Sequence, residues 1–124
     1  KKGEGLTSYL SGSQTDWKSM LINVDGFSNL DILQAGVIPP NPNELLMKPS
    51  LKQFLTEVRQ VYDIIIIDSA PIGVVSDTFL LGQYADATIY VTRENVTPKN
   101  AVTFINDIHK DHKLPNMYLV INGV

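Results

Sequence analysis

The chain has 124 residues, the length of one domain with a single core, so we expect one domain over residues 1–124. Hydrophobic residues make up 44% of it and charged residues 19%, as in folded globular proteins, and the lack of cysteine excludes disulfides and cysteine-based zinc sites. The formal net charge is −3 with neither sign gathered into a block, which argues against nucleic acid as a partner.

The first third of the chain predicts a short helix followed by two paired strands. Residues 6–10 have the composition of a helix that needs packing to be stable. Two apolar-rich stretches at residues 19–24 and 30–35 are joined by residues 25–29, which begin with the Asp-Gly pair of tight turns. We therefore expect a strand pair here.

The middle of the chain predicts a stiff loop and two helices. Residues 39–42 include three prolines, which fix φ and remove amide donors, so this segment is either a partner-binding loop or a rigid connector. Residues 43–47 and 50–62 have helical patterns. In the second, apolar side chains recur at spacings of three and four and so form one face that packs on a sheet.

Four consecutive isoleucines at residues 64–67 predict a central strand. A strand that is apolar on both faces is typical of a parallel sheet with helices on each side, because strands that face water alternate apolar and polar residues. A loop is expected at residues 69–73.

The last third repeats an order of helix, strand, helix, strand. Helices are expected at residues 77–84 and 98–110, and strands at residues 87–91 and 117–121. This alternation predicts an α/β fold with a parallel sheet and right-handed crossovers.

Polar residues at the strand ends are the first candidates for chemistry, because open parallel sheets bind ligands beyond the carboxyl ends of their strands. Asp68 follows the isoleucines and can hold Mg²⁺ through water, or it can simply brace the next turn. Arg93 can contact a nucleotide or a neighbouring subunit, or be a solvated charge. Asn122 can bind a base edge, or form a turn with Gly123.

Several motifs, in this order along the chain, resemble the bacterial tyrosine kinases (BY-kinases) of capsular and exopolysaccharide biosynthesis, a deviant-Walker branch of the P-loop ATPases. The most specific is Pro-Pro-Asn-Pro-Asn-Glu-Leu-Leu at residues 39–46. Residues 5–12 and 30–36 are similar to motifs upstream of it in the family. Residues 62–72 resemble the family's Walker B region, and residues 120–124 its strand that ends at the nucleotide base.

The resemblance implies a P-loop NTPase-like, Rossmann-like three-layer fold, of which this chain is the carboxy-terminal portion. It implies an ATP-dependent protein tyrosine autokinase with Mg²⁺ and ATP as cofactors. By this resemblance Asp68 is the catalytic carboxylate and also binds Mg²⁺ through water. Asn122 binds the edge of the adenine base. Asp77 is a candidate second acidic contact, although with Ser76 it also opens a helix, where capping competes.

The resemblance also implies partners and a location. These are other copies of the kinase, whose tyrosine-rich tails are phosphorylated in trans, and polysaccharide export proteins at the cytoplasmic face of the bacterial inner membrane. Two alternatives stay open: a non-catalytic regulatory or assembly module of the export machinery, and a partitioning-type ATPase.

The family's phosphate loop has no counterpart in this sequence. A Gly-rich turn ending Gly-Lys-Ser/Thr is lacking, as is the aspartate-rich Walker A′ strand. The five tyrosines are scattered rather than clustered. We therefore expect the chain to be part of a longer protein and to be inactive by itself.

Overall fold

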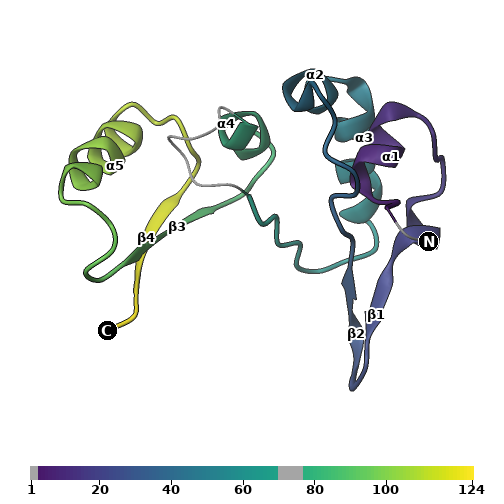
Figure 1. Cartoon of the computed structure of the whole chain (residues 1–124), viewed down its shortest axis with the longest axis horizontal. Coiled ribbons are helices and arrows are strands. Elements are labelled where there is room, and N and C mark those ends of the chain that lie inside the picture. The colour runs from purple at the N-terminus through teal and green to yellow at the C-terminus, as the bar shows by residue number, and fades with distance from the viewer. Residues whose placement is uncertain (1–2, 70–76) are drawn as a thin grey trace. The chain divides into compact units, whose positions relative to one another are not determined.

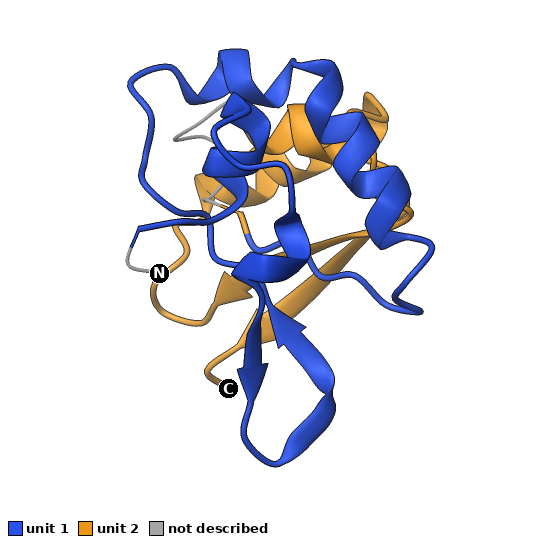
Figure 2. Cartoon of the chain, turned by 90° about the vertical axis from the view of Figure 1, so that its right-hand side faces the viewer, with its two compact units in different colours: residues 1–68 blue, residues 69–124 orange. Residues whose placement is uncertain are grey.

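The computed structural model describes residues 3–69 and 77–124, with the side chain of Asp77 outside the description. The chain divides into two compact units, Lys1–Asp68 and Ser69–Val124, and each is described by itself (Figure 2). The single domain expected for residues 1–124 stays a prediction. Part of the loop expected at residues 69–73 lies outside the described residues.

Three helices and a 3-10 turn form the core of the first unit (Figure 1). They are α1 (Leu6–Ser11), α2 (Pro42–Leu46), α3 (Pro49–Val58) and the 3-10 helix η1 (Trp17–Met20). Their apolar faces bury Tyr9, Leu10, Trp17, Met20, Leu45, Leu51, Phe54, Leu55 and Val58. The Phe54 ring lies 5.6 Å from that of Tyr9 and 5.7 Å from that of Trp17, which it meets edge to face. Such tilted pairs are the favoured geometry of aromatic rings, so η1 and α1 are fixed to α3 through one aromatic side chain.

The strand pair predicted in the first third is an antiparallel hairpin of β1 (Ile22–Val24) and β2 (Phe27–Ile32). Its turn is tighter than expected, because Asp25 and Gly26 alone separate the strands and Gly26 takes a φ of 84°. Positive φ costs glycine little, which is why the Asp-Gly pair can turn the chain here.

Two predictions in the first unit are wrong at their boundaries. The helix expected over residues 50–62 ends at Val58, because the amides of Val61 and Tyr62 both donate to the Val58 carbonyl and close a turn. The apolar stretch at residues 19–24 begins in η1 rather than in a strand. An apolar pattern indicates which side chains are buried, whereas the residue at which a helix or strand ends is determined by its hydrogen bonds.

The predicted strand at residues 64–67 is not assigned as a strand, and its isoleucines are not buried. The exposed fractions alternate, with 79% for Ile64, 38% for Ile65, 88% for Ile66 and 41% for Ile67. Alternation with a period of two is typical of extended chain, and in the part of the chain that the structure describes no strand pairs with this segment. A sequence pattern can indicate that a segment is extended, but a β-strand forms only when a second segment pairs with it.

In the second unit, helix α5 (Asn100–Lys110) lies beside a two-stranded parallel sheet (Figure 1). Its elements are α4 (Asp77–Gly82), β3 (Thr88–Arg93), α5 (Asn100–Lys110) and β4 (Met117–Asn122). β3 and β4 pair in register from Thr88 with Met117 to Arg93 with Asn122. This parallel pairing across a helical connection confirms the predicted α/β class.

The core of the second unit is small. Ile105 and Ile108 of α5 are buried, as is Leu114 in the connection to β4. A Cβ on Gly82 would lie 2.4 Å from Leu114 Cδ2, so the end of α4 approaches this connection as closely as glycine allows. No helix within the described ranges is long and apolar enough to cross a membrane.

Candidate active site

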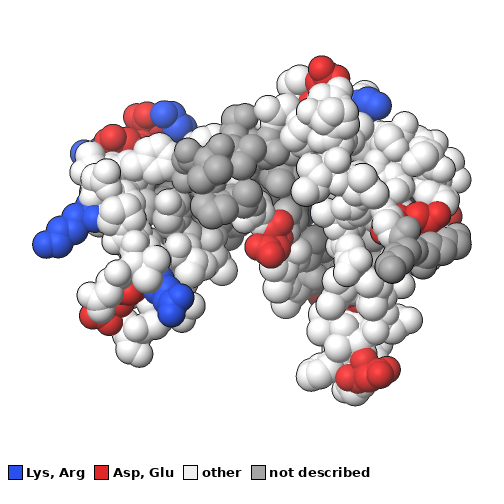
Figure 3. Space-filling model, in the orientation of Figure 1, with Lys and Arg blue, Asp and Glu red and all other residues white. Residues whose placement is uncertain are grey.

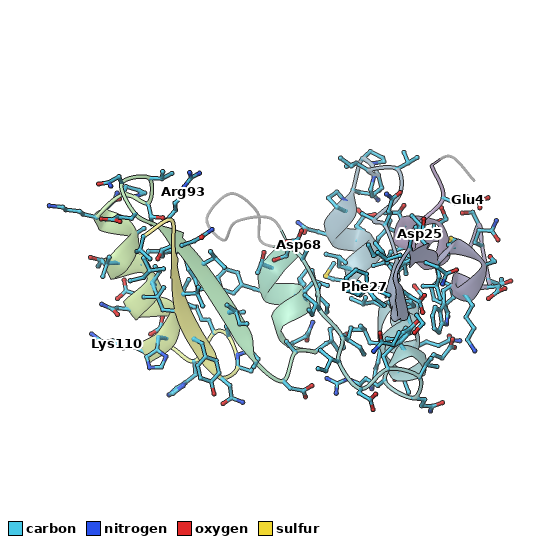
Figure 4. All side chains as sticks on the ribbon, turned by 90° about the horizontal axis from the view of Figure 1, so that it is seen from below. Glu4, Asp25, Phe27, Asp68, Arg93 and Lys110 are labelled. Carbon is cyan, nitrogen blue, oxygen red and sulfur yellow. The ribbon has the colours of Figure 1, made fainter. Side chains whose placement is uncertain are left out.

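Asp68 ends the extended isoleucine segment, and its side chain is exposed (Figure 4). A single accessible carboxylate suits Mg²⁺, which keeps several of its waters and takes one or two protein carboxylates together with the phosphates of a nucleotide. The chemistry of this donor therefore fits the predicted ion. Its neighbour Ser69 accepts a long hydrogen bond of 3.5 Å from the Thr78 hydroxyl of α4. The residue after Asp68 is thus tied to the helix that follows.

Asp77 is the first residue of α4, so the predicted helix does begin here. Its side chain, and the preceding Ser76, lie outside the described residues. Neither the second acidic contact nor the capping role of this carboxylate is therefore defined, and both stay predictions.

Arg93 and Asn122 meet at the carboxyl ends of β3 and β4, where the sequence placed them. They are register partners, and the Glu94 amide donates to the Asn122 carbonyl at 3.1 Å. A Cβ on Gly123, whose φ is 75°, would lie 3.3 Å from Arg93 Cγ, so the stem of the arginine rests on this glycine. The parallel register brings a cation and an amide to one edge of the sheet.

Asn122 also forms the local bond of an Asn-Gly turn. Its Oδ1 accepts a hydrogen bond of 2.8 Å from the Gly123 amide. The Nδ2 amino group is the part of this side chain left to meet a ring nitrogen of a base.

The Thr97-Pro98 pair predicts a capping hydroxyl for the next helix, but Lys99 is the N-cap of α5 and Thr97 bonds to Arg93 instead. Its Oγ1 accepts a 2.8 Å hydrogen bond from the Arg93 amide, and its own amide donates to the Arg93 carbonyl at 2.9 Å. These two bonds close the turn after β3 and fix the backbone from which Arg93 projects. A hydroxyl residue four positions after a strand end is a turn signal that could have pointed to it.

A groove of about 240 Å³ opens between α5 and this edge of the sheet. It is lined by Thr92, Arg93, Glu94, Asn95, Thr97, Val102, Ile105, Asn106, Leu119 and Ile121. Side chains alternate along a strand, so Leu119 and Ile121 share the face of β4 toward the groove while Asn122 belongs to the other face. The groove therefore shares Arg93 with the predicted nucleotide site but does not contain Asn122.

On the face shown in Figure 3 charged side chains of both signs occur singly or in small groups among uncharged atoms. Among the described residues, the ionisable groups with shifted pKa values lie in the first unit. A hydrogen bond to Asp31, burial and the charge of Asp31 raise the pKa of Tyr62 to about 12. Hydrogen bonds from Gln53 and Trp17 lower the pKa of Glu57.

Known proteins resemble the chain in both sequence and fold. It is 36% identical over 102 residues to the tyrosine-protein kinase CpsD of Streptococcus pneumoniae, which is 82% of this chain and 44% of that protein. It is 31% identical over 119 residues to the tyrosine-protein kinase YwqD of Bacillus subtilis, 96% of this chain and 49% of that protein. The crystal structure of the VpsO kinase domain superimposes with a TM-score of 0.85 at 32% identity, over 99% of this chain and 60% of that one.

The chain thus spans less than half the length of either relative. No protein-family model matches it. The similarity nonetheless runs through nearly every element described above, including the Asp68 segment and the paired ends of β3 and β4.

Proposed function

We propose, from the premise that this chain is a homologue of the bacterial tyrosine kinases, that the protein it comes from is an ATP-dependent protein tyrosine kinase. The observation that carries the proposal is the coincidence of two findings. The relatives are named tyrosine-protein kinases, and in this chain an exposed carboxylate ends the apolar segment that resembles their Walker B region.

The residues of this chain suit the work of phosphoryl transfer, which rests on positioning and charge neutralisation. Mg-ATP, when bound, supplies the γ-phosphoryl group that passes to a tyrosine hydroxyl. Asp68 would orient the waters around Mg²⁺ from the end of its segment. Arg93 would offer a cation to the nucleotide, and Asn122 its Nδ2 amino group to the adenine edge.

The partners and location follow from the same proposal. We place the complete protein at the cytoplasmic face of the bacterial inner membrane, where it acts with polysaccharide export proteins. Its acceptors would be tyrosine-rich tails of other copies, because the tyrosines of this chain are scattered and Tyr90 lies within β3. Capsular or exopolysaccharide synthesis is the process it would regulate.

The test is an autophosphorylation assay on the complete protein with radiolabelled ATP, followed by phosphotyrosine detection and mass spectrometry. We expect phosphotyrosine that forms only with a divalent cation and is abolished by a chelator. Adding a tagged, inactive copy should yield label on that copy, since transfer occurs in trans.

Two results would contradict the proposal in different ways. ATP hydrolysis without phosphotyrosine would favour the partitioning-type ATPase. Neither hydrolysis nor phosphotyrosine would favour a non-catalytic assembly module.

A further inference from the structure

We expect the isoleucine segment to pair as a strand in the complete protein, and its four identical residues do not specify its register there. Residues 64–67 are four identical side chains, so shifting the segment by one position replaces isoleucine with isoleucine at three of the four places. In a strand such a shift moves every later residue by roughly 3.3 Å and turns it to the opposite face. Asp68 is the residue that a slip would misplace, and its correct position must therefore be fixed from outside the run.

The amino-terminal end of the segment is held by a side-chain hydrogen bond. The Tyr62 hydroxyl donates to Asp31 Oδ2 at 2.6 Å, across 31 positions of the sequence. The other oxygen of that carboxylate, Oδ1, accepts from Asn23 Nδ2 at 2.7 Å, and Asn23 is the cross-strand partner of Asp31 in the hairpin. Both oxygens are thus engaged, which fixes the rotation of the carboxylate that receives Tyr62.

The ring of Tyr62 is held as well. Its centroid lies 6.4 Å from that of Trp17, and Trp17 is buried and donates from Nε1 to Glu57 Oε2 at 2.9 Å. The Tyr62 amide donates to the Val58 carbonyl at 3.0 Å. Tyr62 is therefore fixed at its backbone, ring and hydroxyl against β1–β2, η1 and α3 of the same unit.

The far end of the segment has a weaker tie. There the Thr78 hydroxyl reaches Ser69 Oγ at 3.5 Å, near the limit for a hydrogen bond between hydroxyls. A 2.6 Å bond to a carboxylate is much the stronger of the two.

We propose that the Tyr62–Asp31 hydrogen bond sets the register of the isoleucine segment, which makes Tyr62 a positioning residue for Asp68. The importance of that position for catalysis rests on the proposed function. The register itself does not, because it follows from the contacts around Tyr62.

The experiment compares Tyr62→Phe with Tyr9→Phe in the complete protein. Tyr9 is a matched control, because it is a buried tyrosine of the same unit, and burial together with the Glu57 carboxylate raises the pKa of its hydroxyl. Amide hydrogen exchange is followed in peptides that cover residues 63–69, α3 and α5. We expect Tyr62→Phe to speed exchange in residues 63–69 by about tenfold, the effect of losing one hydrogen bond to a charged group, and to leave α3 and α5 unchanged. Tyr9→Phe should leave residues 63–69 at the wild-type rate.

A second readout separates positioning from general stability. In autophosphorylation assays, Tyr62→Phe should raise the Mg²⁺ concentration for half-maximal rate and lower kcat, with the KM for ATP at saturating Mg²⁺ unchanged. A purely structural loss would reduce the amount of active protein and leave the Mg²⁺ dependence alone.

Each outcome decides the inference. Wild-type exchange in residues 63–69 of Tyr62→Phe would overturn it, and so would a rise of equal size in α5, which would show that Tyr62 supports the whole fold. Faster exchange in residues 63–69 with an unchanged Mg²⁺ dependence would overturn the link to Asp68. If the wild-type protein makes no phosphotyrosine, the proposed function fails while the exchange result still decides the register.

Discussion

At the scale of single residues, the contacts that organise the first unit join positions far apart in the sequence. Tyr62 bonds to Asp31, and Trp17 donates to Glu57 across 40 positions. Nothing in the spacing of these residues pairs them, because each partner is chosen by how the helices pack. The sequence could place Arg93 and Asn122 at strand ends from local pattern alone, and Asp68 at the end of the isoleucine segment. It could not show that Thr97 holds the Arg93 backbone or that Tyr62 holds the start of the isoleucine segment.

Tyr62 gives a pH-dependent prediction. Its pKa in the folded protein is raised to about 12, above the ordinary value near 10, by the hydrogen bond to Asp31 and by burial. The folded state therefore holds this proton more tightly than the unfolded state does. The stabilisation is fully present below pH 10 and is lost as the pH rises from about 10 to about 12.

The measurement is the free energy of unfolding of wild type and Tyr62→Phe, by urea denaturation at several pH values from 8 to about 11. The difference between the two proteins should be constant up to about pH 10 and then shrink. In tyrosinate absorbance, Tyr62→Phe should remove one tyrosine that ionises at raised pH, while Tyr9, whose pKa is raised by burial and by Glu57, remains in both proteins. A difference that stays constant to pH 11 would count against the hydrogen bond to Asp31.

At the scale of elements, the existence of most helices and strands was predictable and their ends were not. The hairpin, α5 and the parallel pair β3–β4 follow from apolar periodicity and turn residues. The end of α3 was missed because it depends on two amides that share the Val58 carbonyl. The isoleucine segment was predicted as a buried strand and is neither assigned as a strand nor buried, because pairing and burial depend on neighbours that its own residues do not specify.

The first amides of α1 are capped by backbone carbonyls of the segment after β2. The Leu6 amide donates to the Gln34 carbonyl and the Thr7 amide to the Ala35 carbonyl, both at 2.9 Å. The approach is close, because a Cβ on Gly36 would lie 2.7 Å from Thr7 Oγ1 and 3.0 Å from the Gly5 nitrogen. Position 36 therefore requires glycine for two reasons, the close contact with α1 and the positive φ of its backbone.

Comparison of Gly36→Ala with Gly26→Ala tests this contact. Both glycines have positive φ, 87° and 84°, but nothing lies within 4 Å of a Cβ on Gly26. Gly26→Ala should lower the free energy of unfolding by about 1 kcal/mol, the backbone strain alone. Gly36→Ala has the same backbone strain and also a steric clash between the new Cβ and α1, so it should lower the free energy of unfolding by about 3 kcal/mol. Urea denaturation measures both, and equal losses would mean that the approach of α1 contributes nothing.

At the scale of the whole molecule, the α/β class came from the alternation of helices and strands, and the kinase resemblance came from motifs that lie in every part of the chain. The relatives and the VpsO kinase domain bear out both. What the sequence could not supply is what covers the many large apolar side chains that stay exposed, among them Ile66 and Ile121. Burial of a strand is a property of its neighbours, and the pattern of one segment shows only that it is suited to burial.

Phosphoryl transfer should depend on the Asp68 carboxylate, and the autophosphorylation rate of Asp68→Asn in the complete protein measures this most directly. Asp63→Asn is the matched control, since Asp63 is an exposed carboxylate at the other end of the same four isoleucines. Asp68→Asn keeps the shape and removes the charge, so we predict a fall in kcat of roughly hundredfold or more, with Asp63→Asn within about twofold of wild type. A wild-type rate for Asp68→Asn, or an equal fall for both variants, would contradict this account.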